Sequence, residues 1–241
     1  MHLEKSNVLV MVPAFNEEES VRAVLESLRA HGYRAVLISD GSSDATAQIG
    51  RSTGIDVLEL PINLGVGGAL RAGFRYARRR SFAAVVQVDA DGQHPVEEIA
   101  NLIDAANSTD AHMVIGSRFV GDASRMRVSG VRRIAMWVLA RSASAAADTE
   151  ITDSTSGFRL IREPLLGQFA SQFANNYLGD TYESVVSAGR AGYRVTEIPA
   201  GLLERRNGES TASTGSAVRF TLKGLGVAML GFHKRLGRAE R

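Results

Sequence analysis

The chain has 241 residues, a formal net charge of +2 and no cysteine. This length is enough for one α/β domain with a sizeable core, and the lack of cysteine excludes disulfides and thiol-based catalysis or metal binding. The small net charge gives no reason to expect nucleic acid as a partner. No stretch approaches ~18 uninterrupted apolar residues, so no membrane-spanning helix is expected, and the start of the chain is interpreted as a strand rather than a secretory signal.

Short apolar runs alternate with segments of helical periodicity along the first half of the chain. The runs that predict strands are 8–12, 35–39, 57–60, 85–88 and 113–115. Between the first two, apolar residues recur at helical spacing up to Leu28, with Asn16 and Glu19 as the expected capping box and Gly32 as the end. This alternation predicts a doubly wound, largely parallel sheet with helices on both faces.

Two carboxylates, Asp89 and Asp91, leave the end of the fourth run, just before a helix expected near Pro95. Open α/β sheets bind ligands at the carboxyl ends of their strands, and two like charges so close need a cation or a shared proton. A magnesium ion carried in by a diphosphate meets that need. Taken alone, however, the short Asp-x-Asp pattern favours the plainer explanation of a strand end and a helix cap.

The glycine-rich turn after the third run invites comparison with phosphate-binding loops. A dinucleotide-binding pattern that starts at Gly65 would require glycine at position 70, which is Leu70, and the Lys-Ser/Thr of a Walker A loop is absent. Backbone amides facing a phosphate and close helix–sheet packing explain these glycines equally well.

The regular alternation breaks down over residues 117–150. This stretch contains Arg125, Arg127, Arg132 and Arg133. A long irregular segment beside a site predicts a binding loop whose arginines suit phosphate oxygens, and a solvated basic face is the alternative. A helix is expected over 135–147, an edge strand over 192–199 and a C-terminal helix over 217–236.

Further motifs occur in a specific order. They are Pro13-Ala14-Phe15-Asn16-Glu17, Asp40-Gly41-Ser42-Ser43-Asp44, Asn63-Leu64-Gly65, Asp89-Ala90-Asp91, Gly116-Ser117-Arg118-Phe119, Asp153 with Ser156-Gly157-Phe158-Arg159, Glu183 before Gly192, Glu197-Ile198-Pro199, and Arg205 with Gly208 and Ser210. In order and spacing, from about Val8 to Leu230, they resemble family 2 glycosyltransferases, and most closely the polyprenyl-phosphate branch that includes dolichyl-phosphate mannose synthases. With this resemblance, a ligand-binding role becomes the favoured interpretation of Asp89 and Asp91.

The resemblance implies the GT-A fold of nucleotide-diphospho-sugar transferases, an α/β fold with a mostly parallel central sheet flanked by helices. It assigns the nucleotide-diphosphate sugar to Pro13, Phe15, Glu17, Asp40, Gly65, Asp89, Ala90, Asp91 and Gln93. Asp89 and Asp91 would bind Mg²⁺ or Mn²⁺, and Gln93 would reach the metal or the diphosphate. A carboxylate at Asp40 is chemically suitable, because uracil and guanine both present ring N–H donors.

For the acceptor phosphate, the resemblance implies Arg118, Arg132, Arg133, Arg205 and Ser210. The expected catalytic residues are Asp91, Arg118 and Arg205. The chain departs from the pattern at Thr211, where many relatives have lysine, so the expected acceptor site lacks one cation. Asp44 is expected to cap a helix and His94 to be structural.

The implied activity is that of a metal-dependent, inverting hexosyltransferase of the EC 2.4 class, which moves a sugar from a GDP- or UDP-linked donor to a polyprenyl or dolichyl monophosphate. A phosphate monoester has a second pKa of about 6, so this acceptor needs positioning more than deprotonation. The alternative is a glycan or small-molecule hydroxyl acceptor, which needs a base such as Asp153, Asp180 or Glu183. A nucleotide-binding regulatory protein without turnover is a third hypothesis, which the carboxylate pair and the arginines disfavour.

The expected division is a catalytic domain over 1–215 and an amphipathic, basic helix over 216–241. The apolar run 225–232 is too short to span a bilayer, but with its flanking cations it fits a helix in the headgroup plane. A helix packed on the sheet or buried in a homo-oligomer is the alternative. Because a polyprenyl tail stays in the bilayer, the expected location is peripheral, on the cytoplasmic face of a membrane.

Overall fold

A seven-stranded sheet forms the centre of the computed structural model, which describes residues 1–120, 130–173, 181–201 and 236–239, with backbone only for 130–135. The strands are β1 (Val8–Ala14), β2 (Arg34–Asp40), β3 (Asp56–Leu60), β4 (Ala84–Gln87), β5 (Met113–Ser117), β6 (Arg159–Arg162) and β7 (Val195–Pro199). Their order in the sheet is β3-β2-β1-β4-β6-β5-β7. The neighbouring strands are parallel except at β6, which runs antiparallel to both β4 and β5. The predicted mostly parallel sheet is therefore confirmed.

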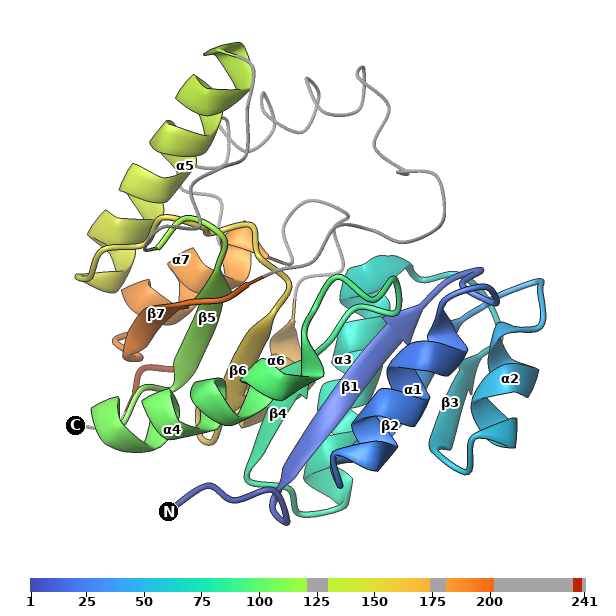
Figure 1. Ribbon diagram of the computed structural model, residues 1–241. Coiled ribbons are helices and arrows are strands. Elements are labelled where there is room, and N and C mark those ends of the chain that lie inside the picture. Colours follow the sequence, from blue (N-terminus) through green and yellow to red (C-terminus); the bar gives the residue numbers. More distant parts are fainter. Residues whose placement is uncertain (121–129, 174–180, 202–235, 240–241) are drawn as a thin grey trace.

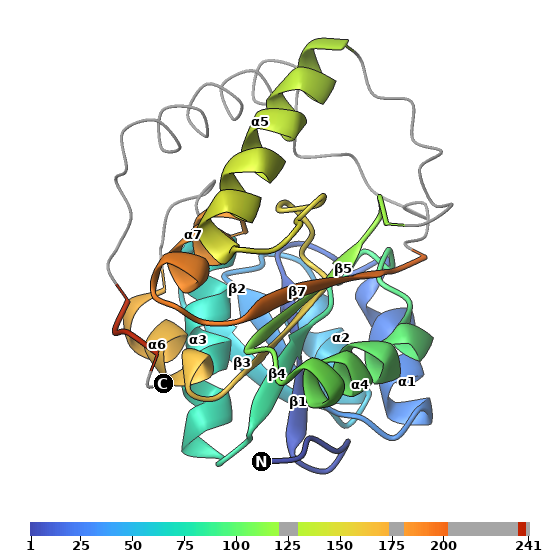
Figure 2. The same ribbon diagram turned by 90° about the vertical axis from the view of Figure 1, so that its left-hand side faces the viewer.

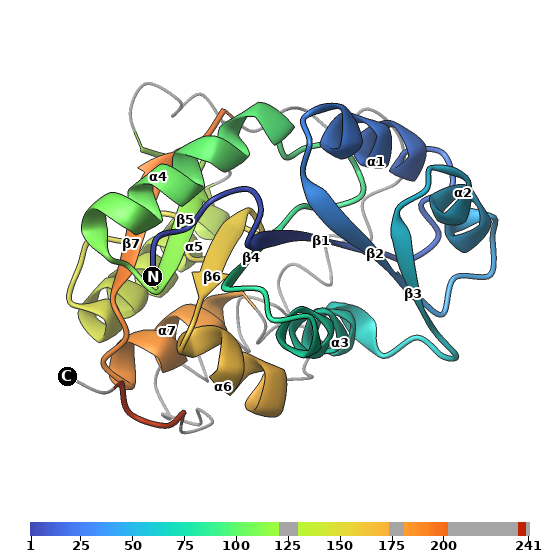
Figure 3. The ribbon, with the colours of Figure 1, turned by 90° about the horizontal axis from the view of Figure 1, so that it is seen from below.

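Helices cover both faces of the sheet (Figure 3). They are α1 (Val21–Ala30), α2 (Thr46–Ser52), α3 (Gly65–Arg79), the short 3₁₀ turn η1 (Val96–Glu98), α4 (Ile99–Thr109), α5 (Gly130–Ala147), α6 (Leu165–Gln172) and α7 (Tyr182–Arg190). Figure 3 shows α1, α2 and α4 on one face and α3, α6 and α7 on the other. The chain crosses over so often because parallel strands need a connection that returns to the same end of the sheet.

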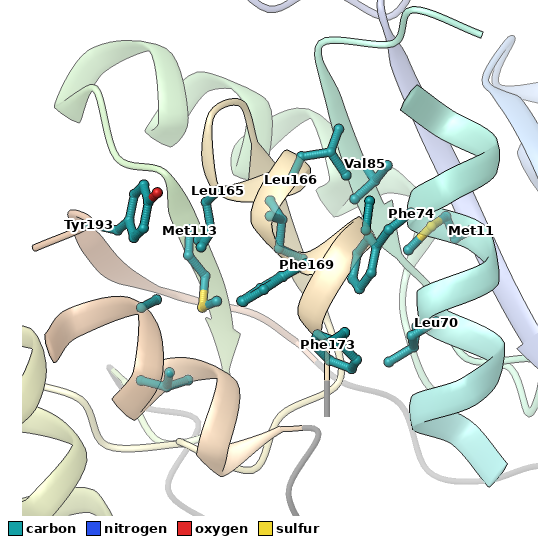
Figure 4. Packing of buried hydrophobic residues seen from close by; sticks show 14 of the residues in the cluster. Met11, Leu70, Phe74, Val85, Met113, Leu165, Leu166, Phe169, Phe173 and Tyr193 are labelled. Atoms are coloured by element: carbon teal, nitrogen blue, oxygen red, sulfur yellow. The ribbon is translucent and has the colours of Figure 1, made fainter. Parts of the chain in front are cut away.

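Each face of the sheet buries its own hydrophobic cluster, because successive strand residues point to opposite faces. Within β1, Leu9 and Met11 belong to the cluster under α3 and α6, whereas Val8, Val10 and Val12 belong to the cluster under α1 and α4. Figure 4 shows the first cluster, in which Phe74, Phe169 and Phe173 pack with ring centroids 5.0–5.6 Å apart. These layers hold the carboxyl ends of the strands in place.

The predicted capping box at the start of the first helix is wrong. Helix α1 begins at Val21, and no side chain caps its first turn. Asn16 lies before the helix in a left-handed conformation (φ 55°), and its side-chain oxygen accepts the N–H of Ser43 instead. A partner 27 residues away in the sequence thus competes successfully with the local cap.

Strand β6 and helices α6 and α7 were not predicted from the sequence. Strand β6 is short, with an arginine at each end, and both arginines are buried. The guanidinium of Arg162 donates to the carbonyls of Ala106 and Met1, which satisfies it inside the protein. The edge strand expected over 192–199 is confirmed as β7 (Figure 2).

Most of the predicted C-terminal helix, and the boundary at 215/216, lies outside the described residues. Residues 236–239 are described and are not helical. Gly237 donates its N–H to Gln168 and Ala239 donates its N–H to the carbonyl of Ala191. This part of the chain therefore lies against the helical layer formed by α6 and α7.

Candidate functional site

The carboxyl ends of β1, β2 and β4 bring the N-terminal motifs together. Strand β1 pairs with β2 on one side and β4 on the other, so the residues that follow these three strands are neighbours. Asp40 ends β2, and Asp89 follows β4 by two residues. This is the edge at which open α/β sheets bind ligands.

The buried Asp40 carboxylate organises the glycine-rich turn after β3. Its Oδ1 accepts the N–H of Leu64 at 2.8 Å. Burial raises the pKa of Asp40, and the backbone N–H groups of Leu64 and Gly65 act in the opposite direction. Gly65 has a φ of +76°, and a Cβ at Gly68 would lie 2.4 Å from the Cβ of Leu64. These two glycines are therefore required by the turn itself.

Exposed apolar side chains follow the ends of β1 and β3, the two strands that flank β2. Phe15 follows β1, and Ile62 and Leu64 follow β3; their exposed fractions are 45%, 63% and 47%. The backbone of Ile62 packs against Gly41, since a Cβ there would approach within 2.5 Å. Large apolar groups left in water beside a buried carboxylate are suited to a flat ring that carries an N–H donor.

The loop after β1 and the turn after β2 are joined by reciprocal hydrogen bonds. Asn16 donates its N–H to Ser42 and accepts the N–H of Ser43. Glu18 donates its N–H to Asp44, and the Glu18 carboxylate accepts the N–H of Ala45. Asp44 also accepts the N–H of Thr46, the first residue of α2, which supports the predicted capping role, although the N-cap position itself is Ala45.

We predict that Asn16→Ala lowers the free energy of unfolding by about 1–2 kcal/mol. The substitution removes a hydrogen bond to Ser43 and places alanine in a left-handed conformation that asparagine tolerates better. Urea denaturation measures the change. Asn16→Asp is the matched control, because it keeps the acceptor oxygen and should cost less than half as much; equal losses in both variants would contradict the explanation.

The Asp89 carboxylate has close neighbours on three sides. Its Oδ1 accepts from Gln87 at 3.1 Å, and a Cβ at Gly157 would lie only 3.0 Å from its Oδ2. The Asp89 N–H donates to His94 Nδ1 at 2.9 Å, so the neutral ring carries its proton on Nε2, which lies 3.6 Å from Asp89 Oδ2. His94 is buried and packs on Phe158, with ring centroids 5.1 Å apart. Its burial, its ring packing and its hydrogen bond to the Asp89 backbone support the predicted structural role.

Asp89 and Asp91 are suited to hold part of a metal coordination sphere. Asp91 is half-buried and accepts the N–H of Gln93 at 3.0 Å, while the Asp89 side chain is 38% exposed. Within the described ranges, no three His, Asp or Glu side chains gather so as to hold a metal ion. Two carboxylates fit a Mg²⁺ or Mn²⁺ ion whose remaining ligands come from a diphosphate and water.

Arg118, directly after β5, forms a bidentate ion pair with Asp153. Its Nε and Nη2 lie 2.7 and 2.9 Å from the two Asp153 oxygens. Burial acts to raise the pKa of Asp153, but the hydrogen bonds and charge of Arg118, with Thr155, outweigh it and lower that pKa. The Asp153 hydrogen bonds, opposed by burial, raise the pKa of Arg118, and the charge of Asp89 raises it further. Arg118 is thus a permanent cation near the carboxyl edge of the sheet.

Residues 9–169 match Glycosyl transferase family 2. The chain belongs to this family. Its family 2 relatives include the undecaprenyl-phosphate mannosyltransferase of Micrococcus luteus, 29% identical over 95% of this chain and 99% of that protein. Another is the polyprenol monophosphomannose synthase of Mycolicibacterium smegmatis, 30% identical over 96% of this chain and 89% of that protein. The chain is a glycosyltransferase.

The family 2 chain also shares its fold with solved structures. Glucosyl-3-phosphoglycerate synthase from Mycobacterium tuberculosis, in complex with Mn²⁺, UDP-glucose and phosphoglyceric acid, superposes with a TM-score of 0.69. The identity is 19%, and the match covers 92% of this chain and 79% of that one. Together with the sheet order, this confirms the GT-A fold.

The structure brings together part of the set of site residues expected for a family 2 enzyme. Pro13, Phe15, Glu17, Asp40, Gly65, Asp89, Ala90, Asp91, Gln93 and Arg118 lie at or near the carboxyl edge of the sheet. Arg132 and Arg133 belong to α5, but their side chains, together with Arg125, Arg127, Asp180, Arg205, Ser210 and Thr211, lie outside the described residues. The expectations for this second group stay predictions.

The residues that contact the site residues from behind were not predicted from the sequence. Gln87 donates to the Asp89 carboxylate, and Glu197 accepts the N–H groups of Thr152 and Asp153 in the loop that carries Asp153. The motif Glu197-Ile198-Pro199 contributed to the resemblance, but it gave no role for the glutamate. Only the pairing of β7 with β5 brings Glu197 to this loop.

Proposed function

We propose that the chain is an inverting glycosyltransferase that moves a sugar from a GDP- or UDP-linked donor to a polyprenyl or dolichyl monophosphate. The observation that carries the proposal is the state of Asp153. This candidate base is fully buried, and both of its oxygens are bound to Arg118. Asp153 is therefore poorly placed to deprotonate a hydroxyl acceptor, whereas the Arg118 cation is suited to bind a phosphate acceptor. Relatives named for undecaprenyl, polyprenol and dolichyl phosphate support the same acceptor class.

The described residues divide the work between the donor and the acceptor. Asp40 would accept a ring N–H of the base, and Phe15 would pack against it. Asp89 and Asp91 would hold Mg²⁺ or Mn²⁺, which when bound neutralises charge on the departing diphosphate. Arg118 would place the acceptor phosphate opposite the leaving group. The phosphate oxygen then bonds to the anomeric carbon as the bond to the diphosphate breaks, which inverts the configuration.

The deciding experiment is a screen of UDP- and GDP-sugars against short polyprenyl phosphates, with detection of lipid-linked sugar. The proposal expects metal-dependent transfer to the lipid phosphate and none to the corresponding polyprenol. Transfer to glycan or small-molecule hydroxyls alone would establish the alternative acceptor class.

Substitution of Glu183 separates the two acceptor classes from the enzyme's side. Glu183 is buried in the first turn of α7. A phosphate acceptor brings no proton that must be removed, so Glu183→Gln should retain kcat within about tenfold of the unaltered enzyme, measured where the variant is shown to be folded. A loss of about 10³-fold that rises with pH back toward normal would instead indicate a hydroxyl acceptor and a base at this position.

We also propose that the enzyme works at a membrane surface, since its lipid acceptor stays in the bilayer. No helix among the described residues is long and apolar enough to cross a membrane. The basic segment 216–241 is the part proposed to lie in the headgroup plane, as a second unit beside the catalytic domain over 1–215, and its helix lies largely outside the described residues.

A further inference from the structure

The loop that carries Asp153 is held by one carboxylate from the far edge of the sheet. Glu197 Oε1 accepts the N–H of Asp153 at 2.7 Å, and Glu197 Oε2 accepts the N–H of Thr152 at 2.7 Å. The Thr152 hydroxyl also donates to Oε2 at 3.0 Å. Two consecutive backbone amides bound by one carboxylate fix the position and direction of the peptide between them.

A second chain of hydrogen bonds runs from Glu197 to the backbone beside Arg118. Thr152 has one hydroxyl proton and donates it to Glu197, so at the 3.0 Å contact with Ser117 it must be the acceptor. Ser117 Oγ in turn accepts the N–H of Phe119 at 3.1 Å. The order of donors is therefore fixed from Phe119 through Ser117 and Thr152 to Glu197. Chains that point in one direction reinforce their members.

Both chains end at Arg118. One passes through the Asp153 carboxylate to its guanidinium, and the other reaches the residues on either side of it, Ser117 and Phe119. Within the described part of the chain, Nη1 of Arg118 makes no hydrogen bond, and the side chain is 29% exposed. Among the described residues, the Nε–Nη2 edge is thus bound to Asp153 and Thr155, while the Nη1 side has no hydrogen-bond partner.

Glu197 binds only neutral donors among the described residues, although it lies half-buried on edge strand β7. A carboxylate whose only role was to stabilise the edge strand could pair equally well with a nearby cation. Here its two oxygens are used entirely on Thr152 and Asp153. The arrangement serves the geometry of the loop.

We infer that Glu197 is a positioning residue for Arg118, acting through Thr152 and Asp153 to aim the free side of the guanidinium at an anionic oxygen. The inference rests on the proposed function for the identity of that anion, a phosphate. It adds a residue from the far edge of the sheet to the site, which neither metal nor substrate need touch.

The test observes the Arg118 guanidinium directly. In ¹⁵N-labelled protein, the Nε–H of Arg118, assigned by its loss in Arg118→Lys, should be shifted and slow to exchange because it is bound to Asp153. Glu197→Gln replaces one acceptor oxygen by an NH₂ group that faces backbone N–H donors, which should loosen the loop that carries Asp153. The Nε–H proton of Arg118 should then exchange with solvent at least about tenfold faster. Turnover should fall about 10- to 100-fold with the donor KM unchanged within about twofold.

Glu59→Gln is the matched control. It makes the same change on β3, the opposite edge strand, where Glu59 pairs with Arg51 at the surface, and it should leave both the Arg118 signal and turnover unchanged. An unchanged Arg118 signal in folded Glu197→Gln would overturn the inference. Because the signal does not depend on turnover, this failure is distinguishable from failure of the proposed reaction.

A second pair of variants covers the case in which Glu197→Gln does not fold. Thr152→Val removes the hydroxyl from the second chain and keeps the backbone amide, so the Arg118 proton should again exchange faster. Thr152→Ser restores the hydroxyl and should restore the protection. Equal exchange in the valine and serine variants would contradict the inference.

Discussion

Asp89→Asn and Asp91→Asn are each expected to lower kcat by about 10³-fold or more. The two carboxylates lie two residues apart in the loop after β4, and in the proposed site they supply the negative charge that holds the metal. Folding should survive, because each substitution relieves repulsion between like charges. Turnover with Mg²⁺ or Mn²⁺ and calorimetric titration of GDP and UDP with and without metal measure the two effects.

Asp104→Asn provides the control for loss of one negative charge. Asp104 is exposed on α4 and belongs to no part of the proposed site. It should retain turnover and metal-dependent nucleotide binding within about twofold. If Asp89→Asn or Asp91→Asn kept near-normal activity in the presence of EDTA, the assignment of these residues to a metal would be wrong.

Arg118→Met is expected to lower the free energy of unfolding by about 3–5 kcal/mol near neutral pH, in addition to its effect on turnover. The substitution leaves the Asp153 carboxylate, whose side chain is 0% exposed, without the cation that compensates its burial. In the double variant Arg118→Met/Asp153→Asn, the buried charge is gone, so a large part of the stability should return. Urea denaturation of the unaltered protein, the two single variants and the double variant gives the coupling free energy between Arg118 and Asp153.

The destabilisation by Arg118→Met should also depend on pH. In the unaltered protein the pKa of Asp153 is lowered, so the pair contributes stability above the ordinary carboxyl pKa of about 3.9, and this is lost as the pH falls through the lowered value. Without Arg118, burial alone raises that pKa, so the variant gains stability as acid protonates Asp153. The difference between the two proteins should therefore narrow from pH 7 toward pH 4.

Arg22→Met is the control for removing a paired arginine at the surface. Arg22 and Glu26 lie one turn apart on α1, 3.5 Å from each other, with half or more of each side chain exposed. An exposed pair of this kind contributes about 0–1 kcal/mol. A loss in Arg118→Met no larger than in Arg22→Met, or one that did not change with pH, would contradict the account of Asp153 as a buried charge.

Sequence patterns were sufficient for the parallel half of the sheet and for placing the predicted donor-binding residues at its carboxyl edge. Strand β4 is wholly buried and is apolar up to Gln87. Local composition therefore predicts where the strand ends and that the two carboxylates follow it. The same holds for the turn at Asp40, whose residues lie next to one another in the chain. Local order of this kind needs no knowledge of what packs against it.

Other features depend on contacts between distant segments, and periodicity carries no information about these. Asn16 has the right neighbours for a helix cap but binds Ser43. From its sequence, strand β6 is too polar to be predicted in the middle of a sheet. It is stable there because distant carbonyls, those of Ala106 and Met1, accept hydrogen bonds from Arg162. A buried arginine is stable only where such acceptors converge, and convergence is a property of the folded chain.

By itself, the sequence determined the family, the alternation of strands and helices, and the residues expected to meet the donor, because these depend on motif order and on local apolar runs. Only the tertiary structure decided what the second half of the chain does around Arg118. It placed Asp153, a candidate base by sequence, in an ion pair with Arg118, and it brought Glu197 from the far edge of the sheet to the backbone N–H of Asp153. The physical reason is that burial and hydrogen-bond partners, which set the charge state of a carboxyl group, are fixed only when β5, β6 and β7 assemble.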